Sequence, residues 1–116
     1  MTANPLYQVP FQPQMLVGAL SHTLDRPSLL MDDGRVFTAG DLRDVMSRWC
    51  QALHVAGVPK GSVAAILATN RPEVLFFCFA TMMEEIVHVP LHPRGAVEDY
   101  LYILQDAGVE TLVYDP

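Results

Sequence analysis

Two histidines, His88 and His92, have a spacing that would suit a zinc site, because histidines four positions apart on a helix share one side. His88, however, stands in a short apolar run typical of a strand, and His92 follows in a loop bounded by prolines. Strand side chains alternate between faces, so this spacing does not bring the two rings together. No cysteine or carboxylate stands nearby at ligand spacing, and we therefore expect no metal site here.

Cys78 is the candidate nucleophile, but its neighbours argue against that role. Phe76, Phe77 and Phe79 stand beside it in the sequence, and an apolar environment raises the pKa of a thiol instead of lowering it. Cys50 stands in a second predicted helix, so we expect two free, buried thiols in a protein of the reducing cytosol.

Glu84 and Glu85 are paired carboxylates in the sequence, yet adjacent residues on a helix point in different directions. They therefore do not form an acid/base pair, and we expect a solvated helix end or a contact with a partner. His22 and His54 fall near predicted helix ends, where the helix dipole favours an imidazolium, and we interpret both as structural.

The loops lack the glycines of the common nucleotide-binding motifs. The turn after the first inner strand reads Ala68-Thr69-Asn70-Arg71-Pro72, with no glycine to let the backbone approach a pyrophosphate, and no Walker loop is present. We expect no self-contained dinucleotide binding, and we assign no catalytic, cofactor-binding or metal-binding residue.

Three short apolar segments predict strands at residues 63–68, 86–90 and 111–114, and the stretches between them, 71–84 and 96–107, have helical patterns. The first strand shows no polar alternation, which indicates burial on both faces. Asn70 is the expected cap of the 71–84 helix, with Pro72 in the first turn. Strands separated by such helices pair in parallel through right-handed crossovers, so the fold class is α/β, with a β-α-β-α-β unit of three parallel strands.

A helix, a β-hairpin and a long helix are expected before this unit. Residues 1–13 have the composition of an irregular lead-in, residues 14–24 that of a helix, and residues 28–31 and 35–38 form a hairpin around Gly34. Thr38 and Asp41 form a variant capping box that should begin the long helix, and Gly57 should end it in a left-handed conformation.

The composition argues against several classes of partner. The 116 residues carry a formal net charge of −6, which gives no electrostatic reason to expect a nucleic acid or an anionic membrane. Hydrophobic residues make up 51% of the chain, a share that hints at missing partner surface. No signal peptide is recognisable and the longest apolar run is too short to span a bilayer, so we expect a cytoplasmic protein without a transmembrane segment.

Seven short segments, taken in order, resemble the N-terminal segment of the adenylate-forming enzymes, a family of acyl-CoA synthetases, luciferases and adenylation domains of peptide synthetases. The segments are Asp33-Gly34-Arg35 before Phe37-Thr38, Asp41-Leu42, Leu53 leading to Gly57-Val58, Lys60-Gly61-Ser62-Val63-Ala64, Asn70-Arg71-Pro72-Glu73, Val89-Pro90-Leu91-His92-Pro93 and Tyr102-Ile103-Leu104-Gln105-Asp106-Ala107-Gly108. The resemblance covers about residues 15–116, and the Asn70 and Leu91 segments look most like those of bacterial fatty-acid-CoA ligases.

The resemblance implies a two-step ligase that uses ATP, Mg²⁺ and CoA. A carboxylate attacks the α-phosphate of ATP to give an acyl-adenylate, and the CoA thiol then displaces AMP. The family's phosphate loop, adenine-binding segment, ribose-binding aspartate and catalytic lysine have no counterpart in the matched segment. Residues 14–116 are therefore expected to form a truncated N-terminal part of the AMP-binding domain, an incomplete subdomain of the acyl-CoA synthetase-like fold. Alone, this chain is expected to bind no cofactor and to be inactive.

The segment Met83-Glu84-Glu85-Ile86 departs from the family, whose members usually have Leu-Gly-Ala before the second strand. The dipole opposes glutamates at the carboxyl end of a helix, and a left-handed cap is less accessible without glycine. Either the turn is built differently here or these acids meet a partner.

Two interpretations remain open. The chain is either the N-terminal fragment of a fatty-acid-CoA ligase, with the remainder of that enzyme as its partner, or a stand-alone binding or oligomerisation module that kept the fold without catalysis. A truncated parallel sheet leaves an unpaired edge and uncovered helix faces, so we also expect self-association through that edge or through an apolar helix face.

Overall fold

The chain divides into two compact units, Met1–Val45 and Met46–Pro116. The computed structural model describes residues 12–116. The expected irregular lead-in, residues 1–13, therefore lies outside the described residues except for its last two positions, which belong to the first helix.

Helix α1, Gln12–His22, opens the described part of the first unit. It begins earlier than the expected residue 14 because Pro13 is tolerated in a first turn, where no N–H is needed. It also ends before the expected residue 24. The carbonyl oxygen of Leu24 accepts the N–H of Gly40 at 2.9 Å, a bond that ties this segment to the start of the next helix.

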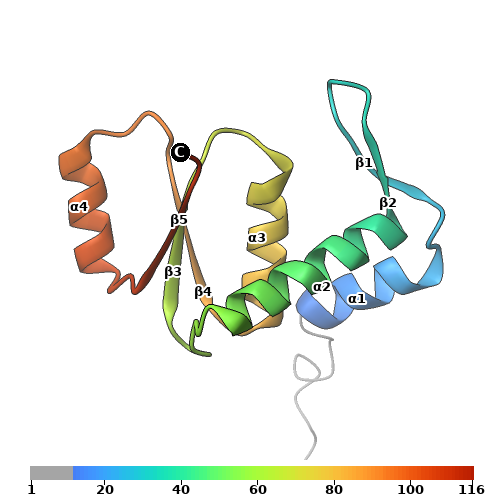
Figure 1. Ribbon diagram of the computed structural model, residues 1–116, viewed down its shortest axis with the longest axis horizontal. Coiled ribbons are helices and arrows are strands. Elements are labelled where there is room, and N and C mark those ends of the chain that lie inside the picture. Colours follow the sequence, from blue (N-terminus) through green and yellow to red (C-terminus); the bar gives the residue numbers. More distant parts are fainter. Residues whose placement is uncertain (1–11) are drawn as a thin grey trace, which may run out of the picture. The chain divides into compact units, whose positions relative to one another are not determined.

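The hairpin is confirmed, with β1, Pro27–Leu30, antiparallel to β2, Val36–Thr38 (Figure 1). Gly34 occupies the left-handed region at φ 88°, where a side chain would be strained. The carboxylate of Asp33 accepts hydrogen bonds from the N–H and Nε of Arg35, at 3.0 and 2.7 Å. These bonds lower the pKa of Asp33 and hold the turn closed.

The capping box that begins α2, Ala39–Val55, is also confirmed. The N–H of Thr38 donates to Asp41 Oδ2 at 2.9 Å, and the N–H of Asp41 donates to Thr38 Oγ1 at 3.1 Å. At the other end of the helix Gly57 has φ 75°, and its N–H donates to the carbonyl oxygen of His54 at 3.0 Å. The helix therefore begins and ends as its terminal residues predict.

The second unit contains a three-stranded parallel sheet with the strand order β4-β3-β5, which confirms the α/β class. Its strands are β3, Val63–Leu67, β4, Val87–Leu91, and β5, Thr111–Tyr114. In the central strand Ala64, Ala65 and Ile66 are buried, as expected for a strand covered on both faces. β4 begins one residue later than predicted because the N–H of Ile86 bonds to the carbonyl oxygen of Thr81 at 2.9 Å.

Helices α3, Pro72–Met83, and α4, Val97–Asp106, lie on opposite faces of this sheet (Figure 1). That arrangement is expected because the two right-handed crossovers run in opposite directions along the sheet, from β3 to β4 and then from β4 past β3 to β5. The core lies on the α3 face, and its buried members are Leu53, Ala64, Ile66, Phe77, Ala80 and Ile86. Trp49 of α2 packs edge-on against Phe77, with ring centroids 6.0 Å apart. No helix within residues 12–116 combines the length and the apolar content needed to cross a membrane.

Candidate functional site

The carboxyl ends of the three parallel strands lie together along one edge of the sheet, the edge that runs across the strand ends. Open α/β folds usually bind their ligands there. The segments that follow β3 and β4, residues 68–71 and 92–96, lie at this edge together with Asp115 after β5. The segments after β3 and β4 lead to helices on opposite faces of the sheet (Figure 1). In open α/β sheets a ligand crevice usually forms at such a point, so these segments are the first candidate site.

Arg71 connects the start of α3 to the end of β5. Its Nη1 lies 2.7 Å from Asp115 Oδ1, and its Nε lies 3.2 Å from Glu73 Oε2. The hydrogen bond to Asp115, with the charges of Asp115 and Glu73, raises the pKa of Arg71. Arg71 is also the N-cap of α3, so the expected cap at Asn70 is wrong: Pro72 is already helical and no side chain caps the helix.

A shallow depression of about 150 Å³ lies beside this ion pair. Its lining residues are Trp49, Ile66, Ala68, Arg71, Glu73, Val113, Tyr114 and Asp115. Small-molecule sites usually enclose roughly 300–1,000 Å³, so this depression is too small for a nucleotide. The guanidinium at its rim is already held by two carboxylates and is not free to bind an anion.

Tyr100 holds the loop between β4 and α4. Its hydroxyl donates to the carbonyl oxygen of His92 at 2.6 Å and accepts the N–H of Gly95 at 2.8 Å. A Cβ atom on Gly95 would lie 2.6 Å from Cε1 of Tyr100, so a larger residue there would force the ring to shift. The N–H of Arg94 completes the loop by donating to His92 Nδ1 at 3.1 Å. The tyrosine stands five positions after the glycine, and no pattern in the sequence signals that they meet.

His88 and His92 have separate structural settings, as expected from their places in a strand and in a loop. His88 packs in β4 against Phe77, with ring centroids 5.3 Å apart, and its burial lowers its pKa. Its Nδ1 is buried and has no hydrogen-bond partner. His92 instead serves the loop described above. Within residues 12–116 no group of three His, Cys, Asp or Glu side chains is arranged to hold a metal ion.

Both cysteines are free thiols, as predicted, although each is half-buried and not fully buried. Burial, together with the charge of Glu84 and a hydrogen bond to it, raises the pKa of Cys50 to about 11. Burial also raises the pKa of Cys78. Neither thiol is therefore activated as a nucleophile.

The turn after α3 keeps the left-handed geometry that the sequence made doubtful, and Glu85 supplies it. Glu85 has φ 55° and is the one non-glycine residue with positive φ among residues 12–116. The N–H of Glu85 points to the carbonyl oxygen of Met82 at 3.4 Å, and that of Ile86 bonds to Thr81. This is the hydrogen-bond pattern of a Schellman cap, in which glycine usually occupies the left-handed position.

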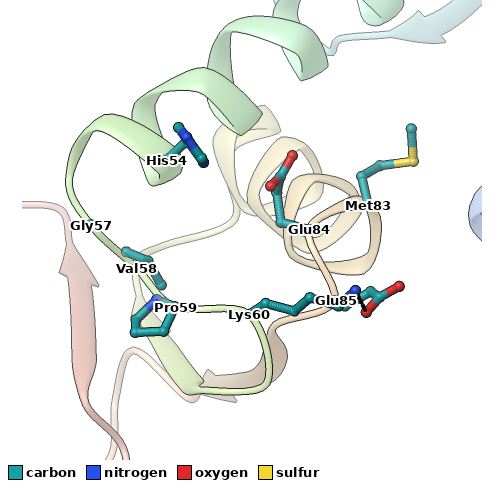
Figure 2. A pocket seen from close by; sticks show the side chains of 8 residues that line it. All are labelled: His54, Gly57, Val58, Pro59, Lys60, Met83, Glu84 and Glu85. Atoms are coloured by element: carbon teal, nitrogen blue, oxygen red, sulfur yellow. Dashed lines mark ion pairs between the residues drawn. The ribbon is translucent and has the colours of Figure 1, made fainter.

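The side chain of Glu85 also pairs with the turn after α2. Lys60 Nζ lies 2.6 Å from Glu85 Oε2, and the N–H of Gly61 donates to the carbonyl oxygen of Glu85 at 2.8 Å (Figure 2). No sequence pattern signals this ion pair, because its two residues are distant in the chain. Its members lie at the opposite edge of the sheet from Arg71, where the strands begin.

Known proteins resemble the chain over most of its length. The family described as "AMP-binding enzyme" matches residues 18–116. A medium/long-chain-fatty-acid–CoA ligase of Mycobacterium tuberculosis is 38% identical over 102 residues, which are 88% of this chain and 18% of that protein. The 2-succinylbenzoate–CoA ligase of Bacillus subtilis is 30% identical over 104 residues, 90% of this chain and 21% of that protein. The chain therefore spans about a fifth of the length of these curated relatives.

Solved structures agree with this assignment. The N-terminal subdomain of NpsA from Klebsiella oxytoca, in complex with 3-hydroxybenzoyl-AMSN, superposes with a TM-score of 0.88 at 25% identity and covers 93% of this chain and 27% of that one. The O-succinylbenzoate coenzyme A synthetase of Bacillus subtilis, in complex with ATP and magnesium ion, superposes with a TM-score of 0.84 at 28% identity, covering 90% of this chain and 28% of that one. The chain belongs to the AMP-binding enzyme family and corresponds to the N-terminal region of an adenylate-forming enzyme.

Proposed function

We propose that this chain is the N-terminal part of a fatty-acid-CoA ligase that acts on medium- or long-chain fatty acids. The observation that carries the proposal is its 38% identity, over 88% of its length, to the mycobacterial medium/long-chain-fatty-acid–CoA ligase. In the proposed reaction the fatty-acid carboxylate attacks the α-phosphate of ATP, which breaks the α–β phosphoanhydride bond and releases pyrophosphate. The CoA thiol then attacks the acyl carbon of the acyl-adenylate and displaces AMP.

The described residues do not by themselves fit ATP, Mg²⁺ or CoA. The loop after β3 carries no glycine, and the depression beside it measures about 150 Å³. The cation at its rim, Arg71, is held by Asp115 and Glu73. Residues 12–116 also offer no three-ligand metal cluster. We therefore derive no chemical step from this chain and propose that other parts of the ligase bind these three groups.

The proposed role of the chain is that of a scaffold. The parallel sheet and α3 form a packed core, and Arg71 and Tyr100 fix the segments that leave the carboxyl ends of the strands. A ligase needs such rigid segments because reacting groups must be held in place before reaction. The remainder of the enzyme is the partner that this role requires.

A pair of chimeras tests the proposal. This chain replaces the matching 102 residues of the mycobacterial ligase in one chimera and the matching 104 residues of the Bacillus 2-succinylbenzoate–CoA ligase in the other. Acyl-CoA formation is measured for each with its own acid. We expect the fatty-acid ligase chimera to keep the larger share of its parent's activity. Equal retention, or better retention in the second chimera, would contradict the fatty-acid assignment.

A second experiment tests the scaffold role on the chain itself. The purified 116 residues are assayed for ATP–pyrophosphate exchange dependent on a fatty acid, with the mycobacterial ligase as positive control. We expect no exchange above a sample without protein. Robust, carboxylate-dependent exchange by this chain would overturn the scaffold role.

A further inference from the structure

A second and larger depression, of about 500 Å³, lies at the opposite edge of the sheet from Arg71. It is bounded by the end of α2, the turn that follows it and the end of α3 (Figure 2). Its lining residues are His54, Gly57, Val58, Pro59, Lys60, Met83, Glu84 and Glu85. Figure 2 shows the Glu84 carboxylate and the His54 ring on facing sides, with the Lys60–Glu85 ion pair along the bottom.

The electrostatics of this depression favour a cation. α2 ends at Val55 and α3 at Met83, so the negative ends of two helix dipoles converge here. Lys60 lies 2.6 Å from Glu85 Oε2, and those two charges offset one another. Glu84 is half-buried, and no cation among residues 12–116 forms an ion pair with it. One carboxylate and two helix ends therefore face the depression without a counter-charge.

The residues that line the depression favour one kind of cation. The described residues lack the three ligands that a metal ion would need. Val58 and Pro59 form an apolar wall across the depression from the carboxylate, which suits a cation that carries an alkyl chain (Figure 2). We propose that this depression binds an alkylammonium group, with its charge on Glu84 and its alkyl chain on Val58 and Pro59.

Cys50 provides an internal reporter of such binding. Its Sγ lies 4.0 Å from the carbonyl oxygen of Ala80, one turn before Glu84 on α3. Burial raises the pKa of this thiol most, and the charge of Glu84 raises it further. A bound ammonium group offsets that charge, so it lowers the pKa of Cys50 and increases the fraction of reactive thiolate.

A titration of the isotope-labelled chain with n-butylammonium chloride, followed by NMR, tests the proposal. Sodium chloride at equal ionic strength is the reference. We expect saturable shifts confined to the amides around His54, Val58 and Glu84. Glu84→Gln should weaken binding by about two- to fivefold, the range associated with one exposed charge pair. The matched variant Glu98→Gln removes an exposed carboxylate on α4 and should leave binding unchanged.

Shifts that sodium chloride reproduces, or an unchanged affinity in Glu84→Gln, would overturn the proposal. A lysine blocked at both its amino and carboxyl groups, titrated in parallel, identifies the source of the ammonium group. Tighter binding than that of butylammonium indicates a lysine side chain of a partner protein, and equal or weaker binding indicates a free amine.

Site-resolved alkylation keeps the proposal testable in the unmodified chain. Iodoacetamide labelling of both cysteines is followed by mass spectrometry with and without butylammonium. We expect Cys50 to react faster when the amine is present and Cys78, whose pKa is raised by burial alone, to keep its rate. An unchanged rate at Cys50 would count against an ammonium group beside Glu84.

Discussion

Glu85 occupies a left-handed position that glycine should fill better, and a pair of substitutions measures the cost. At φ 55° an L-residue costs roughly 1–2 kcal/mol, which glycine avoids. Glycine also loses more entropy on folding, which offsets about 0.4–1 kcal/mol of that gain. Glu85→Ala and Glu85→Gly both remove the exposed ion pair with Lys60, so its contribution cancels between them. We therefore expect Glu85→Gly to be more stable than Glu85→Ala by about 0.5–1 kcal/mol.

Urea unfolding followed by tryptophan fluorescence gives this difference directly. Trp49 is the single tryptophan of the chain and packs against Phe77, so its emission reports on the core of the second unit. The wild type should lie above Glu85→Ala by the value of an exposed ion pair, about 0.2–1 kcal/mol. All three proteins should unfold with the same dependence on urea concentration.

The control is a position inside an ordinary helix, where the glycine variant should be less stable than the alanine variant. Gln51 is exposed in the interior of α2, where glycine destabilises a helix by about 1 kcal/mol relative to alanine. Gln51→Gly should therefore be less stable than Gln51→Ala. If Glu85→Ala equals or exceeds Glu85→Gly while the Gln51 pair behaves as expected, the argument from left-handed strain is refuted.

Three further changes test other parts of the structure. Gly95→Ala should cost about 1–3 kcal/mol in urea unfolding, because the added Cβ meets the Tyr100 ring at 2.6 Å and displaces its hydrogen bonds; unchanged stability would refute this clamp. The backbone hydrogen bond from Thr38 lowers the pKa of Asp41 below 3.8. The ionised Asp41 therefore stabilises the folded state above that pH, and this contribution is lost as the pH falls through the folded pKa. Asp41→Asn should flatten the acid side of the curve of unfolding free energy against pH. Burial lowers the pKa of His88 below 6.5, so the unfolded state takes up a proton first and stability falls as the pH drops below about 6.5; His88→Leu should remove that dependence, and an unaltered curve would contradict it.

Local features of the sequence were reliable guides to the elements. The capping box at Thr38 and Asp41, the glycine at position 57 and the hairpin around Gly34 all occur as predicted, since each depends on residues a few positions apart. The errors lie at element boundaries. Asn70 was expected to cap α3, but Arg71 occupies that position, where its side chain pairs with Asp115 after β5.

The sequence by itself determined the class of fold and the family. Hydrophobic periodicity and turn residues are local signals that define each helix and strand, and the order of the short segments along the chain identifies the family. Only the tertiary structure decided which side chains meet. Arg71 reaches Asp115 because the parallel sheet places the ends of β3 and β5 side by side, and Lys60 reaches Glu85 because α2 and α3 end at the same edge. It also decided that a glutamate adopts the left-handed cap of α3, since that geometry depends on the neighbouring turn as well as on the residue. Such contacts arise from pairing across the sheet, and no spacing along the chain encodes them.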